Sequence, residues 1–477
     1  MIQCITKERK QEGYDPMCNG IYYKALSVIT ALLTISFSLS AEPPHPSGIN
    51  IRTYHDHKKL ERDVLSPNTN FQQLRSEWTS DFEKLLCRNR IDFATVSYFK
   101  GHWDQIREII EGTVLPPDYL EVLISDVCNA NCVYCRGGKR HHMISNHFIS
   151  QTSADQLAED ILRSPVRRMR LSGYVGDPFA AQAYSSSITL GQKLSKTVSF
   201  GVVTNGIGFD QKAQETFINA EYVNFSLDAM SEEEHFRLKG RKGFEIVLKH
   251  IRDFCSLKSR LQSNVSVRVS FIMRHDILDR AEDIIRELKQ AGVNIIIFKT
   301  AMKYDDQSRL TPGTWEKIEE ELEKLKQRYS DEPDFKVVIS DSLNNASEIL
   351  TNSSIRPSYP RCYFAEHHLT LFADGFFRAC CDSFWNNYQI KFGHMDKVLI
   401  ARDWQEIQRQ LKKLNPAKHC SICPRFPNSY NILMNYLSSM NSEYPGYLDW
   451  FAHEGLNILS SQCNRIDTPS PMQKNSA

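Results

Sequence analysis

Three cysteines, Cys128, Cys132 and Cys135, fall within eight positions of the stretch SDVCNANCVYCRGGKRHH. Clustered thiols of this kind can belong to a zinc site, to a set of structural thiols or to an iron–sulfur cluster. A zinc site needs a fourth ligand, and His141 and His142 stand close by in the sequence. On a four-iron cluster, three thiolates leave one iron without a protein ligand. The spacing alone does not decide between zinc and a cluster.

A second group of cysteines, Cys362, Cys380, Cys420 and Cys423, has the spacing C-x17-C-x39-C-x2-C. Four such residues can form a structural zinc site, two disulfides or a second cluster. Cys381 directly follows Cys380 and could replace it as a ligand. The total of thirteen cysteines is odd and does not suggest a disulfide framework. It favours a reducing compartment with metal or redox chemistry, so we predict a cytoplasmic protein.

The strands and helices that position the first cysteine group can be predicted from Tyr119 onward. Short apolar runs alternate there with amphipathic stretches, as in βα units with a parallel sheet. We expect six strands, over 119–125, 168–173, 199–204, 222–227, 265–272 and 293–299. Right-handed crossovers make this an α/β fold, a partial (β/α)6 TIM-like barrel with its chemistry at the carboxyl ends of the strands. The Cys128 loop directly follows the first strand.

Charge and hydropathy exclude some classes of partner. The chain has 477 residues with 58 basic and 57 acidic side chains, so it lacks the basic surface that nucleic-acid binding requires. The uncharged segment 25–41 is similar to the apolar core of a secretory signal. It is short for a membrane span and rich in Ser and Thr, so we predict no firm membrane association.

The loop CNANCVYC resembles the C-x3-C-x-aromatic-C pattern of the radical S-adenosylmethionine (radical SAM) superfamily. The resemblance covers roughly residues 119–300. It implies that Cys128, Cys132 and Cys135 hold a 4Fe-4S cluster whose open iron binds S-adenosylmethionine (SAM). One electron then cleaves SAM to methionine and a 5′-deoxyadenosyl radical. Tyr134 takes the aromatic position, which in the family lies by the adenine.

Several later strand ends agree with this resemblance. LSGYVGDPF is similar to the Gly-Gly-Glu stretch that receives the methionine amino group, which implies roles for Gly176 and Asp177. Here the acid is Asp rather than Glu, and Val175 is an apparent insertion. VTNG implies that Asn205 contacts the nucleoside. SLDAMSEEEHFRLKG implies that Ser226 lies near the ribose and Arg237 near the methionine carboxylate. A strand end followed by a charged helix would also explain this last stretch.

The second cysteine group is similar to the auxiliary-cluster domain of many radical SAM enzymes, called a twitch or SPASM-like domain. The resemblance implies that Cys362, Cys380, Cys420 and Cys423 hold a second 4Fe-4S cluster, with all four ligands supplied by protein. A closed cluster of this kind passes electrons and does not bind substrate. The later Cys463 has no partner for the longer form of the domain.

These patterns divide the chain into six parts. We predict an N-terminal extension with an apolar segment (1–41), a helical prelude (42–116), a radical SAM core (117–305), a linker helix and strand (306–360), an auxiliary 4Fe-4S domain (361–430), and a C-terminal helix with a polar tail (431–477).

The resemblance favours an oxidoreductase. The radical abstracts hydrogen from a substrate, which then loses an electron to the auxiliary cluster. The one-cluster arrangement resembles alcohol dehydrogenases of aminoglycoside synthesis, so a small polyol or amino-sugar-like metabolite is expected, with flavodoxin or ferredoxin as electron donor. Modification of a ribosomal peptide or protein side chain is the alternative. A non-catalytic zinc-binding interaction protein is the alternative from another class. His235, His367 and His368 are candidate acid–base groups by residue type only.

Overall fold

One sheet of ten strands, in the order β10-β9-β8-β1-β2-β3-β4-β5-β6-β7, organises the described part of the chain. This computed structural model describes residues 71–89, 91, 93–135, 146–173, 175–299, 312–340, 357–381, 391–420, 423 and 425–466. The expected apolar segment 25–41 and the pair His141 and His142 lie outside these residues. Residues 70–477 belong to one compact unit.

The first six strands are the six that the sequence predicts, within three residues at each end. They pair in parallel and in chain order. Their bounds are β1 (Tyr119–Leu123), β2 (Arg168–Ser172), β3 (Ser199–Thr204), β4 (Tyr222–Ser226), β5 (Ser266–Ile272) and β6 (Ile295–Lys299). The strand β7 (Lys336–Ile339) extends the parallel sheet beyond β6. The predicted partial barrel is therefore confirmed.

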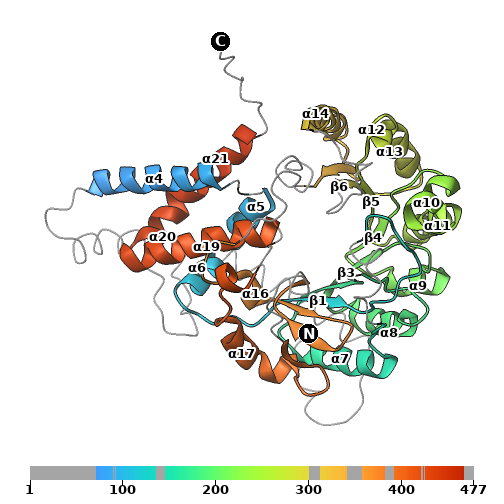
Figure 1. Ribbon diagram of the computed structural model, residues 1–477, viewed down its shortest axis with the longest axis horizontal. Helices are drawn as coiled ribbons and strands as arrows, with labels where there is room; N and C mark the ends of the chain where they lie inside the picture. Colours follow the sequence, from blue (N-terminus) through green and yellow to red (C-terminus); the bar gives the residue numbers. More distant parts are fainter. Residues whose placement is uncertain are drawn as a thin grey trace, which may run out of the picture. The chain divides into compact units, whose positions relative to one another are not determined.

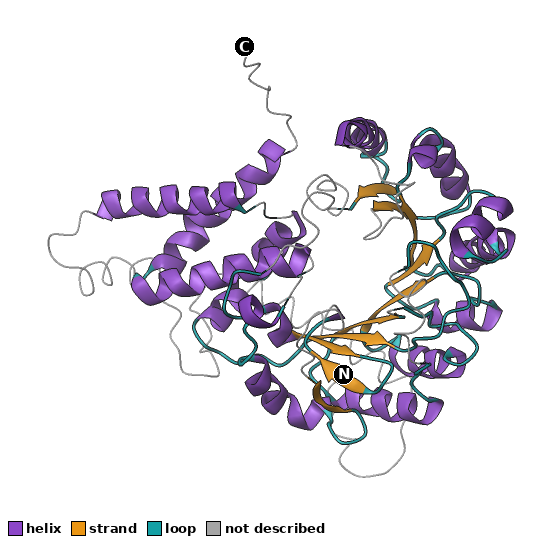
Figure 2. Ribbon diagram, viewed as in Figure 1, coloured by secondary structure: helices purple, strands orange, loops and turns teal. Residues whose placement is uncertain are grey.

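Helices cover the convex side of this curved sheet, while the strands follow the inside of the arc (Figures 1 and 2). In the order of the chain these helices are α7 (Gln151–Arg163), α8 (Tyr184–Leu194), α9 (Gln211–Phe217), α10 (Glu232–Lys239), α11 (Phe244–Leu261), α12 (His275–Leu278), α13 (Ala281–Gln290) and α14 (Pro312–Arg328).

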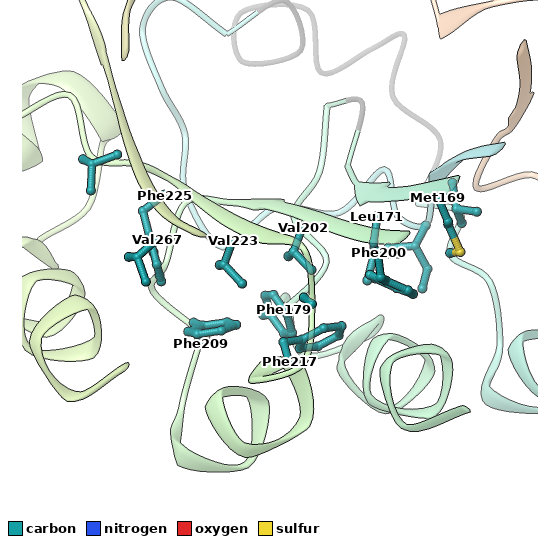
Figure 3. Packing of buried hydrophobic residues seen from close by; sticks show 14 of the residues in the cluster. Met169, Leu171, Phe179, Phe200, Val202, Phe209, Phe217, Val223, Phe225 and Val267 are labelled. Atoms are coloured by element: carbon teal, nitrogen blue, oxygen red, sulfur yellow. The ribbon is translucent and has the colours of Figure 1, made fainter. Parts of the chain in front are cut away.

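The alternation of side chains along each strand explains why one face of the sheet packs against the helices and the other does not. Val223 and Phe225 of β4 are buried against the helices, as are the alternate residues of the neighbouring strands. Figure 3 shows these side chains on one side of the sheet, facing Phe179, Phe209 and Phe217. Because successive side chains of a strand point to opposite faces, the residues between them lie on the concave face, which we call the inner face.

The predicted auxiliary segment contributes three strands to the same sheet: β8 (His368–Leu371), β9 (Phe376–Arg378) and β10 (Lys391–His394). Strand β8 pairs in parallel with β1, starting with His368 opposite Tyr119, and β9 and β10 continue antiparallel. The edge of β1 would otherwise present unpaired backbone groups, so β8 completes its hydrogen bonding. The sheet is therefore continuous from the barrel strands into residues 361–430.

Helices from both ends of the described chain share a second apolar core, which includes Phe82, Phe99, Tyr430 and Trp450. The prelude thus packs onto the C-terminal helices. These elements are α4 (Phe71–Arg88), α5 (Phe93–Gly101), α6 (Trp103–Ile110), α16 (Phe364–His367), α19 (Arg425–Glu443), α20 (Tyr447–Trp450), the π-helix η3 (Phe451–Gly455) and α21 (Leu456–Ile466). The helix α17 (Ile400–Leu411) packs in the core of the sheet instead, and the short α18 (Pro416–His419) follows it. Within the described residues, no helix has both the length and the apolar character that a membrane crossing needs.

Candidate functional site

The Cys128 loop is held from two sides at the carboxyl end of β1. The backbone N–H groups of Asn131 and Val133 donate to carbonyls at the end of α10, at 2.8 and 2.9 Å. On the other side, Asp177 N donates to Val127 O at 3.0 Å. A Cβ added to Gly176 would lie 2.2 Å from Ser125 O, so only glycine permits this close approach. The loop is therefore fixed by backbone contacts before any ligand is considered.

The three thiols of this loop lie close enough to influence one another electrostatically. Burial raises the pKa of Cys128 to about 12 and that of Cys132 to about 11. Two donors nevertheless point at Cys128 Sγ, namely the Ala130 N–H at 3.4 Å and the Asn205 amide at 3.6 Å. Donors that approach a buried sulfur favour a thiolate, and a bound metal supplies the positive charge that keeps such a thiol deprotonated.

These features fit an iron–sulfur cluster. Among the described residues, no three His, Cys, Asp or Glu side chains are arranged to hold a single metal ion. The thiolates of a four-iron cluster bind different irons and do not converge on one point. The buried thiols and their amide donors are consistent with that ligand type.

Asp177 lies beside this loop, where its carboxylate adds to the raised pKa of Cys128. Its two carboxylate oxygens accept from the Thr204 hydroxyl at 3.0 Å, from Asn205 N at 2.6 Å and from Phe179 N at 2.9 Å. The side chain is only 2% exposed, and burial raises its pKa. The carboxylate thus ties the turn after β2 to the end of β3.

Asn205 connects the end of β3 to the cysteine loop. Its Nδ2 donates to Asn129 Oδ1 at 2.6 Å as well as approaching Cys128 Sγ, and its Oδ1 accepts from Ile207 N at 2.9 Å. The amide therefore has partners at both ends, and its direct neighbour among the predicted site residues is Cys128.

Asp228 is the centre of an ionic group beneath the loop. Its Oδ2 accepts from the Tyr134 hydroxyl at 2.7 Å and from Lys239 Nζ at 3.1 Å, while Oδ1 accepts from Ile272 N at 2.9 Å. Burial alone would raise its pKa, but Lys239 and Lys299 outweigh burial and lower it. Asp228 also has a φ of +58°, which is uncommon for a residue other than glycine. The hydroxyl of Tyr134 is therefore fixed by a residue 94 positions later.

Ser226 and Arg237 lie near this group in different ways. Ser226 ends β4, and its carbonyl oxygen accepts from Lys239 Nζ. The Arg237 side chain is 66% exposed and lies 4.0 Å from Glu234. Glu234 is buried and pairs with Arg274. The buried cation of α10 is therefore Lys239, two residues after the one that the sequence pattern suggested.

Three cysteines of the second group come together around Tyr359 and Asn431. The Tyr359 hydroxyl donates to Cys423 Sγ at 3.0 Å, and Asn431 Nδ2 donates to Cys362 Sγ at 3.5 Å. Burial raises the pKa of Cys420 to about 12, and the neighbouring Cys362 adds to this effect. Burial also raises the pKa of Cys362, to about 11. The side-chain donors to Cys423 and Cys362 are thus a phenol hydroxyl and an amide, both neutral.

The fourth predicted ligand, Cys380, lies two residues after the end of β9. Its neighbour Cys381 is close enough to Arg170 for a thiolate at Cys381 to raise the pKa of that guanidinium. Arg170 belongs to β2 and lies on the inner face, so Cys381 lies near the inner face of the barrel.

The two cysteine groups lie toward opposite ends of β1. Cys128 follows the carboxyl end of β1, whereas Cys362 precedes β8, whose first residue pairs with the first residue of β1. Cys380 follows β9, whose last residue, Arg378, pairs with Thr370, and because the two strands are antiparallel the chain continues from there toward the start of β8. The five residues of β1 at a rise of about 3.3 Å span about 16 Å. The inner face of the sheet lies between the two groups.

Two of the candidate histidines, His235 and His367, are buried, His368 is half-buried, and each has a partner. His235 Nδ1 contacts Arg241 O at 2.7 Å, His367 Nε2 contacts the Tyr430 hydroxyl at 3.0 Å, and His368 lies 3.6 Å from Glu121. Burial lowers the pKa of each one. These contacts are structural ones.

Sequence reasoning missed five residues that surround the two cysteine groups. The carboxylate of Asp228 and the ammonium of Lys239 follow β4 within the stretch SLDAMSEEEHFRLKG, but the pattern there drew attention to Arg237 instead. Tyr359 and Asn431 carry no local signal, because α19 brings Asn431 to Cys362 from 69 positions away. Glu121, which pairs with Arg170, reads as an ordinary strand residue.

Comparisons with known proteins agree with this geometry. Residues 122–267 match the family model of the radical SAM superfamily. GTP 3′,8-cyclase of Clostridium perfringens is 24% identical over 161 residues, which are 33% of this chain and 47% of the relative. The same enzyme of Clostridium acetobutylicum is 28% identical over 114 residues, 24% of this chain and 35% of the relative. The matched region thus spans about half or less of the length of these curated relatives.

Two solved structures are similar at low identity. The crystal structure of Streptococcus suis SuiB has a TM-score of 0.47 at 14% identity, over 73% of this chain and 75% of that chain. The structure of anSMEcpe with bound AdoMet has a TM-score of 0.44 at 14% identity, over 73% of this chain and 100% of that chain.

Proposed function

We propose that this chain, which carries a radical SAM domain over residues 122–267, is an enzyme that cleaves SAM reductively and oxidises a substrate. The observation that carries the proposal is the family match over the residues that hold Cys128, Cys132 and Cys135 together at the carboxyl end of β1. The same match favours an enzyme over a zinc-binding interaction protein.

When bound to these three thiolates, a 4Fe-4S cluster supplies the electron that cleaves SAM to methionine and a 5′-deoxyadenosyl radical. The protein holds the loop rigidly from the end of α10 and from Gly176. Gly176, Asn205, Ser226 and the exposed Arg237 are the proposed SAM contacts, with Tyr134 fixed in place by Asp228. Asp177 is proposed to act through Asn205, which it positions.

We propose a second 4Fe-4S cluster on the four ligands Cys362, Cys380, Cys420 and Cys423. The contacts of Tyr359 and Asn431 with two of these sulfurs support this assignment, because such donors stabilise thiolates. The second cysteine group lies about one strand length from the Cys128 loop. This distance suits a cluster that accepts the second electron of a substrate oxidation. The proposed substrate is a small polyol or amino-sugar-like metabolite, and the external electron donor is a flavodoxin or ferredoxin.

Anaerobic reconstitution followed by iron and sulfide analysis tests the proposal. We expect about eight irons per chain for two clusters and about four for one. The reconstituted protein should form 5′-deoxyadenosine from SAM when dithionite is added, measured by chromatography. Cys255→Ala is the matched control, because this buried cysteine packs in the apolar core and its variant should keep its iron. Protein that takes up no iron, or leaves SAM intact, would contradict the proposal.

A further inference from the structure

The inner face of the sheet carries polar and charged side chains where barrel interiors are normally packed with apolar ones. At the middle of β1 and β2 and at the start of β4, these are Glu121, Arg170 and Tyr222, joined by pairing through Gly201 of β3. Arg268 lies next to them on β5, directly opposite Asn224 of β4. Thr370 of β8 pairs with Glu121 on the other side. A layer of polar groups thus crosses the sheet between the two cysteine groups.

The two arginines of this layer differ in their partners. Arg170 is neutralised by Glu121, with its Nε 3.1 Å from the carboxylate. Burial alone would raise the pKa of Glu121, but Arg170 and His368 lower it to about 2, so the carboxylate is charged. The guanidinium of Arg268 lies 4.0 Å from the centroid of the Tyr222 ring. Its Nε donates to Ser266, and it makes no ion pair within the described part of the chain.

Two oxygens on the inner face are buried without a hydrogen-bond partner among the described residues: Asn224 Oδ1 and Thr370 Oγ1. Glu121 Oε2 instead lies 3.6 Å from His368 Nε2. Asn224 is 8% exposed and Thr370 is fully buried. Asn224 uses its other end, Nδ2, to bond Ser270 at 3.3 Å. Buried polar atoms in native proteins are almost always hydrogen-bonded, so such atoms near the guanidinium of Arg268 indicate a ligand.

A second cation lies toward the cysteine loop on the same face. Lys299 ends β6, and it influences both Asp228 and Arg170 electrostatically. Asp228 already pairs with Lys239. The two buried carboxylates of this region, Glu121 and Asp228, are therefore each matched by a nearer cation. The carboxylate that acts on Arg268 is Glu221, which is exposed, so Arg268 and Lys299 can both attract an anion on the inner face.

We infer that this layer binds an anionic group of the substrate, a carboxylate or a phosphate, through the guanidinium of Arg268. The amide oxygen of Asn224 accepts a hydrogen bond from an adjacent O–H or N–H of the same molecule. The inference rests on the proposed function, because it places the substrate between the two cysteine groups. It narrows the substrate class: a polyol that carries a carboxylate or phosphate suits the cations Arg268 and Lys299, whereas an unmodified amino sugar, itself a cation, does not.

Binding of two small probes to the reconstituted holoenzyme tests this inference. Glycolate presents a carboxylate beside a hydroxyl donor, and inorganic phosphate presents the alternative anion. Calorimetric titration is performed without reductant, so that it does not depend on turnover. We expect one probe to bind measurably more tightly than the other, which identifies the anion. Arg268→Gln should weaken that binding about tenfold or more, as expected for loss of a charge-assisted hydrogen bond.

Two further variants keep the test decisive. Asn224→Asp replaces only the side-chain amide with a carboxylate, which then lies opposite Arg268. This variant should abolish binding of the probe, and it keeps the test informative even if Arg268→Gln folds poorly. Arg260→Gln, at the exposed end of α11, is the matched control and should bind the probe as the unmodified protein does. Failure of both probes to bind, or equal binding by Asn224→Asp, would overturn the inference. Absence of SAM cleavage by the unmodified protein would instead overturn the proposed function, and this is measured separately.

Discussion

The two cysteine groups differ in how the chain assembles them and in the charge around them. Cys128, Cys132 and Cys135 come from one short loop, and the buried pair of Asp228 and Lys239 lies directly beneath it. The second group comes from three separate segments, and neutral donors such as Tyr359 contact its sulfurs. An open site must bind a charged cosubstrate, whereas a closed electron carrier needs only its thiolates stabilised. The difference suits the two proposed roles.

The largest expected effect separates these roles. Cys132→Ala removes a ligand of the open cluster, so 5′-deoxyadenosine formation should fall to background. Cys420→Ala removes a ligand of the closed cluster, so SAM cleavage should persist while oxidised product is lost. Each variant should lose about four of about eight irons. Iron analysis and product chromatography measure both. If Cys420→Ala also abolished cleavage, the two groups would not act separately.

The next largest effect concerns the buried ion pair of Asp228 and Lys239, which lies beside the Cys128 loop. Lys239→Met leaves Asp228 buried without its cation, and breaking a buried pair in this way costs about 3–5 kcal/mol of unfolding free energy. Arg237→Met, on the same helix, removes an exposed cation and should cost less than about 1 kcal/mol. Urea unfolding of the anaerobic proteins measures the difference. Equal losses would mean that the buried pair of Asp228 and Lys239 stabilises the fold no more than an exposed cation of the same helix does.

Acid should lower the free energy of unfolding through the protonation of His367, which lies near the second cysteine group. Burial lowers the pKa of His367 from 6.5 to about 4. The unfolded chain therefore binds the proton more readily, so this contribution to stability is complete above pH 6.5 and is lost as the pH falls toward 4. Between pH 8 and pH 5 the loss is about 2 kcal/mol. The charged or titratable groups that face His367 are Asp118, Arg168, His102, His368, Tyr98 and Tyr430.

His367→Gln isolates this contribution, because the amide keeps a polar partner for Tyr430 but does not titrate. The unmodified protein should lose about 2 kcal/mol more than the variant between pH 8 and pH 5. Unfolding free energies at the two pH values measure this. Parallel pH profiles for the two proteins would show that His367 does not titrate in this range.

The sequence predicted the barrel strands because their apolar residues alternate or run continuously over five to seven positions, and because each run is followed by a helical stretch. It also identified both cysteine groups by spacing. It did not predict that β8 pairs with β1, since no local pattern tells which strand will cover a sheet edge 249 positions earlier in the chain. Nor did it identify Lys239, Asn431 or Arg268, whose importance depends on neighbours from distant strands and helices. Local periodicity encodes elements, whereas pairing of charges depends on the completed fold.

The smallest predicted effect tests whether neutral donors tune the second group. Tyr359→Phe removes the hydroxyl that donates to Cys423 Sγ at 3.0 Å. Such a bond stabilises the reduced, more negative cluster more than the oxidised one, so its loss should lower the reduction potential. A bond worth about 0.5–1.5 kcal/mol corresponds to about 20–60 mV for one electron. Redox titration followed by electron paramagnetic resonance measures the shift. Tyr184→Phe, whose hydroxyl bonds Asp210 on the outer helices, is the control and should leave both potentials unchanged. A shift in the potential of the cluster on the Cys128 loop, rather than in the second cluster, would show that the neutral surroundings of Cys423 are not what separates the two groups.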